Sequence, residues 1–162
     1  YFNYLQNIED SVNSYKELPI NKWYWESWIG FYIELKRNMP EYNGWSYVPN
    51  QNGGFMAFYW KYHGNSYLQL EEERFCFKIS IYGHNKYDYR DERTKWHQLI
   101  LEKSQEVGLR VRKPDRFGSG KTMTVAVLED EYLKTDSNGI LDLEETLKVL
   151  RKAEKVLDLA VS

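Results

Sequence analysis

Basic side chains gather in one short stretch of this sequence, and their chemistry suits phosphate binding. Five of them fall within residues 110–121, where Asp115 is the only acid: Arg110, Arg112, Lys113, Arg116 and Lys121. An arginine fork can hold a phosphate through two parallel hydrogen bonds, and the Gly-Ser-Gly run at 118–120 supplies a flexible loop beside them. We therefore expect a nucleic-acid-binding site here, with a solvated face paired to nearby acids as the alternative.

Further cations lie at the start of a predicted helix over residues 87–107. Lys86, Arg90 and Arg93 form a stripe with His97 along one side of that helix. The whole chain has 22 Lys plus Arg against 24 Asp plus Glu, a formal charge of −2. Overall charge therefore neither requires nor excludes a polyanionic partner, and a nucleic-acid site must be a local patch.

Two stretches match part of the sequence of a known ligand-binding loop, but other residues or the neighbouring elements do not fit that loop. Residues 118–122 read Gly-Ser-Gly-Lys-Thr, yet Asp115 stands where a phosphate-binding loop needs its first glycine, and a strand rather than a helix follows. Residues 134–145 resemble a calcium loop, but Lys134 occupies the first ligand position. A turn around Asn138 that leads into a capped helix explains this second stretch without a metal.

Catalytic groups are not gathered in any convincing motif. Glu71, Glu73 and Lys78 could meet near one hairpin as a divalent-metal site, but cross-strand charge pairing explains them equally well. Cys76 is the only cysteine, which fits a small buried residue in a reducing compartment. We expect no catalytic residue, no metal, no cofactor and a cytoplasmic location.

Aromatic residues are unusually frequent, with six Trp, 14 Tyr and seven Phe. A core of this size needs fewer, so some of them should lie at a surface. Trp23, Tyr24, Trp45 and Tyr47 are the candidates for exposed positions. They support a second hypothesis, in which the chain is a protein-interaction or homo-oligomerisation module.

Hydrophobic periodicity predicts four helices around these residues. The first covers residues 4–18, and the second covers residues 22–37, with Asn21 as its cap and Trp25 among its buried residues. The third, 87–107, ends at Gly108 in the left-handed conformation. The last begins after Asp142 as N-cap.

Alternating apolar residues predict strands between the helices. Their ranges are 45–48, 55–62, 67–72, 75–81, 109–113 and 123–128. We expect 55–60 to be covered on both sides, the 72–74 connection to be long or bulged, and Leu70 to pair with Phe77 and Leu68 with Ile79. The order predicts a single α+β domain over residues 1–162, with a mainly antiparallel sheet and helices packed against it.

The ends and the apolar content of the chain add two expectations. No run of about 18 apolar residues occurs, so no membrane partner is expected. The chain begins with Tyr1 rather than Met, which suggests a C-terminal fragment of a longer protein.

Several strand sequences together resemble a known group of proteins. Gly-Gly-Phe-Met-Ala-Phe-Tyr-Trp at 53–60, Tyr-Leu-Gln-Leu-Glu at 67–71, Phe-Cys-Phe-Lys-Ile at 75–79, Arg93 with Trp96, and Met-Thr-Val-Ala at 123–126 look like the C-terminal region of bacterial PD-(D/E)XK nuclease superfamily proteins. The resemblance spans nearly the whole chain. It implies an upstream nuclease domain and a part in defence against foreign DNA. Because no position here matches a nuclease signature, the role implied for this chain is a supporting, non-catalytic one.

Overall fold

The computed structural model describes residues 9–39, 42–51, 53–81 and 86–162, with side chains from residue 88 onward in the last range. Residues 9–12 are helical. The elements that follow are η1 (Asn13–Lys16), η2 (Ile20–Lys22), α2 (Trp25–Asn38), β1 (Asn43–Val48), β2 (Phe55–His63), β3 (Ser66–Glu71), β4 (Arg74–Ser80), α3 (Lys86–Val107), β5 (Val111–Arg112), β6 (Thr122–Leu128) and α4 (Leu143–Val161).

The six strands form one antiparallel sheet in the order β1-β2-β3-β4-β6-β5. The first four strands are an antiparallel meander, as predicted. β5 precedes β6 in the chain, but in the sheet it lies beyond β6 and forms the edge strand. The α+β class is therefore confirmed.

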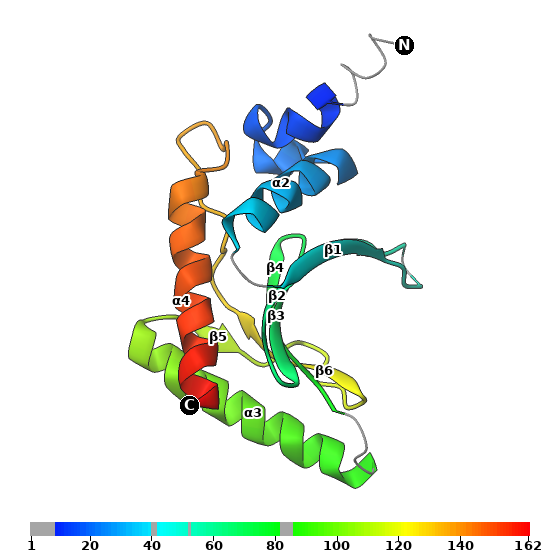
Figure 1. Ribbon diagram of the computed structural model, residues 1–162, viewed down its shortest axis with the longest axis vertical. Coiled ribbons are helices and arrows are strands. Elements are labelled where there is room, and N and C mark those ends of the chain that lie inside the picture. The colour runs from blue at the N-terminus through cyan, green and yellow to red at the C-terminus, as the bar shows by residue number, and fades with distance from the viewer. Residues whose placement is uncertain (1–8, 40–41, 52, 82–85) are drawn as a thin grey trace.

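The sheet is strongly curved, and the helices lie around its convex side (Figure 1). α2 contacts β1 and β2, α4 contacts β2 and β3, and α3 contacts α4, β5 and β6. No described helix lies in the hollow of the sheet. Residues 55–60 still form a central strand with no exposed side chain, as predicted, although on the hollow face only Ala57 is fully buried and Phe55 and Tyr59 are half-buried.

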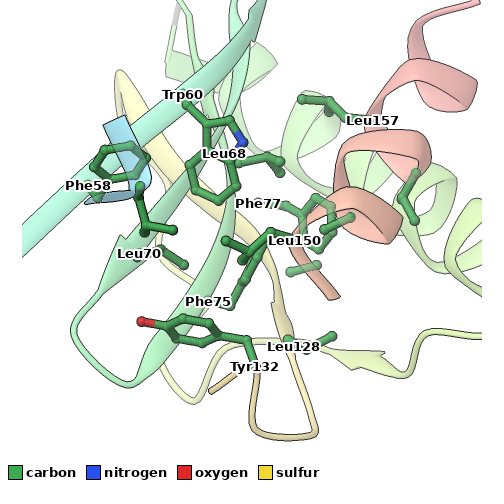
Figure 2. Packing of buried hydrophobic residues seen from close by; sticks show 14 of the residues in the cluster. Phe58, Trp60, Leu68, Leu70, Phe75, Phe77, Leu128, Tyr132, Leu150 and Leu157 are labelled. Atoms are coloured by element: carbon green, nitrogen blue, oxygen red, sulfur yellow. The ribbon is translucent and has the colours of Figure 1, made fainter. Parts of the chain in front are cut away.

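The core fills the space between the convex face and the helices. Figure 2 shows side chains from four strands meeting Leu150 and Leu157 of α4. Cross-strand partners place Phe58, Leu70 and Phe75 in one row across the sheet, and Trp60, Leu68 and Phe77 in the next. All six are buried. The alternation of β4 is confirmed, because Phe75, Phe77 and Ile79 share this face.

The connection between β3 and β4 is a two-residue turn, not the long loop that was expected. Glu71 pairs with Arg74, so only Glu72 and Glu73 lie between the strands. Glu72 has a φ of 56°, which a non-glycine residue rarely adopts. The tighter turn moves the register by two residues, and Leu70 pairs with Phe75 and Leu68 with Phe77. The predicted pairs were wrong, although the face was right.

The second helix begins later than predicted. Asn21 lies in η2 and not at a cap position, and Tyr24 is the N-cap of α2. Trp25, placed on the buried side by its spacing, is exposed because it is the first residue of the helix. Of the predicted 4–18 helix, residues 9–12 are helical and η1 follows, while residues 4–8 lie outside the described part.

The other two helices agree more closely with the sequence. Gly108 follows α3 with a φ of 79°, as expected for a left-handed C-terminal residue. The Asp142 carboxylate accepts a hydrogen bond from the Glu145 backbone N–H at 3.2 Å and caps α4. The fifth strand is shorter than predicted, with two residues instead of five. Among the helices of the described residues, none combines the length and the apolar character needed to span a bilayer.

Candidate nucleic-acid interface

The loop between β5 and β6, residues 113–121, is attached to α3 through Phe117. The Arg93 guanidinium lies 4.0 Å from the centre of the Phe117 ring, and its Nη1 donates to the Phe117 carbonyl oxygen at 2.7 Å. The His97 ring contacts the same phenyl ring edge-on, with centroids 5.6 Å apart. These three contacts hold the loop that carries most of the predicted cations beside the first half of α3.

A second cation reaches the same ring. Lys113 Nζ lies 5.4 Å from the Phe117 centroid. Arg93 Nε, by contrast, is buried without a hydrogen-bond partner among the described residues. Arg93 therefore uses Nη1 and one face of its guanidinium to hold the loop.

Arg110 is held by an acid that the sequence did not identify. Its Nε donates to Asp130 Oδ2 at 3.1 Å, and its Nη2 donates to the other carboxylate oxygen. These hydrogen bonds lower the pKa of Asp130 and raise that of Arg110. The pair forms because Glu129 N–H donates to the Arg110 carbonyl oxygen and aligns the two segments.

Arg112 lies in β5 opposite Val127, on the sheet face that no described helix covers. Its Nη1 contacts Asp115 Oδ1 at 3.2 Å and the Lys113 carbonyl oxygen at 3.0 Å. Both partners come from the same short loop. Arg112 is therefore exposed but already engaged with an acid.

Three of the predicted cations remain exposed without such partners. Arg90, Arg116 and Lys121 make no side-chain hydrogen bond or ion pair with any described residue. The Lys86 side chain lies outside the described part, although its backbone is the first residue of α3.

The predicted set of cations is not a single patch. Arg110 lies beside the end of β6, whereas Lys121 directly precedes its start. The seven residues of β6 separate them, about 23 Å at roughly 3.3 Å per residue. The structure brings Arg93 and Lys113 together at Phe117 and leaves Arg110 apart from Lys121.

Two residues at this interface differ from what the sequence indicated. His97, which its spacing placed in one stripe with the cations, is buried, and its Nδ1 lies 2.7 Å from the Val125 carbonyl oxygen. Phe117 was not identified at all. Its signal was a single aromatic residue inside the basic run Lys-Pro-Asp-Arg-Phe-Gly-Ser-Gly-Lys.

The calcium-like segment forms a turn, as favoured from the sequence. Asp136 Oδ1 accepts hydrogen bonds from the backbone N–H groups of Asn138 at 2.8 Å and Ile140 at 3.1 Å. Gly139 takes a φ of 79° in the same turn. Across the described residues, no three His, Cys, Asp or Glu side chains are grouped so that they could hold a metal ion.

The two acids considered for catalysis lie in different places, with Glu71 at the end of β3 and Glu73 in the β3–β4 turn. Glu71 and Lys78 share the hollow face, where Lys78 Nζ donates to Thr124 Oγ1 at 2.9 Å. Burial lowers the pKa of Lys78 and raises that of the buried Cys76 thiol, which donates to Glu71. Glu73 instead lines a cavity of about 600 Å³ next to Pro19 and Leu133.

The four aromatic residues expected at the surface differ in how much of their side chain is exposed. Tyr24 is 42% exposed and Tyr47 is 56% exposed, and the unexpected Trp25 is 60% exposed. Trp23 is half-buried, with its indole N–H bonded to the Leu18 carbonyl oxygen and its ring against Trp28. Trp45 is also half-buried and packs on the core.

Comparison with known proteins gives no relationship from which a function could be transferred. No family model, no curated protein and no solved structure matches this chain.

Proposed function

We propose that this chain is a non-catalytic accessory domain that engages nucleic acid through the loop 113–121 and the start of α3. The observation that carries the proposal is the Phe117 anchor. It holds Lys113 and its exposed neighbour Arg116 beside the helix that carries Arg90. The resemblance to the C-terminal region of bacterial PD-(D/E)XK proteins supports service to an upstream nuclease domain in defence against foreign DNA.

Unpaired cations are the residues that would contact phosphates directly. When Arg90, Arg116 and Lys121 bind phosphates, they would release the counterions condensed on the nucleic acid without first breaking an ion pair. Arg110 and Arg112 would have to leave Asp130 and Asp115. Because exposed ion pairs contribute only about 0–1 kcal/mol, this exchange is possible but weakens their share of the binding.

Salt dependence tests the proposal. Fluorescence anisotropy with labelled duplex and single-stranded DNA should give a dissociation constant that rises steeply with salt. The double variant Arg116→Ala/Lys121→Ala should reduce the slope of log K against log salt by about two on duplex DNA, at ~0.9 for each phosphate that the protein no longer neutralises.

A matched control removes the same charge from another element. Lys152 and Lys155 are exposed on α4, so Lys152→Ala/Lys155→Ala should leave the salt slope unchanged. Arg110→Ala should have a smaller effect than Arg116→Ala, because Asp130 already holds Arg110. Equal salt slopes for the wild type and the Arg116/Lys121 variant would refute this interface.

A second candidate function, protein interaction or self-association, is favoured by the exposure of Trp25 and Tyr47 on neighbouring elements. Exposed aromatic side chains are frequent anchors of protein interfaces. Light scattering over a range of concentrations should then detect self-association that the Trp25→Ser variant abolishes. A monomer at high concentration, in both wild type and variant, would exclude self-association through this surface.

A further inference from the structure

A pocket whose lining is half aromatic lies between the start of α2, the β1–β2 hairpin and the β3–β4 turn. Its volume is about 470 Å³, and the residues that line it include Trp25, Ile29, Trp45, Tyr47, Met56 and Glu72. Glu72 is the only charged side chain among the described residues that line it. It lies apart from loop 113–121, which is joined to α3.

The four aromatic rings at this pocket, that of Phe55 included, make no contact with other described rings. Trp25, Trp45 and Tyr47 make no ring–ring contact with any described aromatic residue, whereas the interior rings contact one another in a chain that includes Phe31, Tyr32, Phe58, Trp60, Phe75 and Tyr132. Trp25 and Tyr47 are also exposed. Ring surface is therefore available to a ligand at this pocket.

The position of Tyr47 depends on a glycine. The Tyr47 hydroxyl donates to the Gly53 carbonyl oxygen. A Cβ on Gly54 would lie 2.4 Å from the Val48 carbonyl oxygen and 2.6 Å from the Tyr47 hydroxyl oxygen, and Gly54 has a φ of 123°. The hairpin therefore holds the Tyr47 ring against a position that only glycine can occupy.

Glu72 brings an uncompensated carboxylate to these rings. Its only side-chain hydrogen bond is a long one, 3.5 Å from the Met56 backbone nitrogen to Oε1, and no described cation pairs with it. Partial burial raises the pKa of this carboxyl group, and the neighbouring Glu73 adds to the effect. A cation seated beside Glu72 would relieve both penalties.

Two buried tyrosines fix the backbone that carries this carboxylate. The Glu72 N–H donates to the Tyr32 hydroxyl oxygen at 3.1 Å and to the Met56 carbonyl oxygen at 3.2 Å. The Tyr132 hydroxyl donates to the Glu72 carbonyl oxygen at 2.5 Å. Strained φ values that the surrounding structure enforces are concentrated at functional sites, and Glu72 is one of these.

From this juxtaposition we infer that the pocket binds an organic ammonium ion whose nitrogen carries methyl groups. Electron-rich ring faces attract such cations, and one carboxylate supplies the opposite charge. An unmethylated ammonium group has three N–H donors that each need an acceptor. Glu72 is the only carboxylate in a lining that is otherwise mostly apolar, so a methylated nitrogen, which carries fewer N–H donors or none, fits it better.

Choline chloride is the probe that tests this site. In ¹H–¹⁵N spectra its titration should shift the indole N–H signals of the two tryptophans at the pocket and leave the other four in place: Trp25 and Trp45 against Trp23, Trp28, Trp60 and Trp96. 3,3-Dimethyl-1-butanol has the shape of choline without its charge and should cause no comparable shift. A peptide with one trimethyllysine, compared with its unmethylated form, distinguishes a protein-borne ammonium from a free one.

Variants separate the charge from the rings. Glu72→Gln should weaken choline binding by about tenfold, and Trp25→Ala by roughly three- to thirtyfold, as expected for one cation–π contact. Glu73→Gln is the matched control, because Glu73 belongs to the same turn but lines a different cavity, and it should weaken choline binding much less than Glu72→Gln does. The unshifted signals in each spectrum report that the variant is folded.

Three outcomes would overturn the inference. These are equal binding of choline and its neutral analogue, shifts that spread over all six tryptophans, or unchanged affinity in folded Glu72→Gln. Binding of the trimethyllysine peptide but not choline would assign the site to a protein partner, whereas binding of choline alone would assign it to a small molecule. Loss of DNA binding in the Arg116/Lys121 variant would leave all of these results unaffected.

Discussion

Glu72 combines a strained backbone with an unpaired acid, and its substitution can separate the two. An L-residue in the left-handed region pays about 1–2 kcal/mol, whereas glycine loses ~0.5–1 kcal/mol more chain entropy than alanine. With a φ of 56° at this position, Glu72→Gly should therefore be more stable than Glu72→Ala by about 0.5–1 kcal/mol. Urea unfolding followed by tryptophan fluorescence measures the difference.

Glu73 provides the control for this comparison. It is the second residue of the same turn and has no positive φ. The order should reverse there, with Glu73→Ala more stable than Glu73→Gly. If glycine and alanine differ at Glu72 as they do at Glu73, the turn is not strained.

The sequence was enough to identify the cations at the candidate interface, but it did not show which of them are free to contact a phosphate. Arg110 and Arg116 look alike in the sequence, yet Arg110 is bound by Asp130 and Arg116 has no described partner. The difference arises because β5 pairs with β6, which brings residue 130 beside residue 110. Such a partner, twenty positions away, follows from the register and not from any local pattern.

The close approach of the N-terminal segment to α2 depends on Gly30. A Cβ there would lie 1.6 Å from the Val12 carbonyl oxygen and 2.9 Å from Tyr15 Cδ1, so backbone would have to move. Gly30→Ala should lower the free energy of unfolding by about 1–3 kcal/mol, the usual cost of overpacking. Urea unfolding gives the value, and faster trypsin cleavage at Lys16 would show that residues 12–17 separate from the helix.

Gly118→Ala serves as the matched control because nothing lies within 4 Å of a Cβ at that position. Its stability should stay within about 0.5 kcal/mol of the wild type, as for most surface substitutions. A Gly30→Ala protein with wild-type stability and trypsin resistance would contradict the packing described for this segment.

Elements with strong local signals were predicted well from the sequence. The strand at 123–128 and the Asp142 cap are examples, because alternation and capping are encoded within a few residues. The register at Leu70 failed because a Glu-Glu turn has no sequence signature and its φ is imposed by Tyr32 and Tyr132, 40 and 60 positions away. Trp25 failed because periodicity does not say where a helix begins.

The buried cluster joins all parts of the described chain. It extends from Tyr15 near the N-terminus to Ala160 in α4, and includes residues of every strand from β2 to β6. We therefore expect a single cooperative transition, with urea curves from tryptophan fluorescence and far-UV circular dichroism that coincide. Two separate transitions would mean that α2 and η1 form an independent unit.

The position of β6 in the sheet has a consequence for biosynthesis. β4 leaves the ribosome together with β1, β2 and β3, but the strand that pairs with its other side follows only after α3 and β5. Until then the N–H and C=O groups on that side of β4 are open to pairing with other chains. Nascent chains that pause before residue 122 should therefore be the species most prone to aggregate.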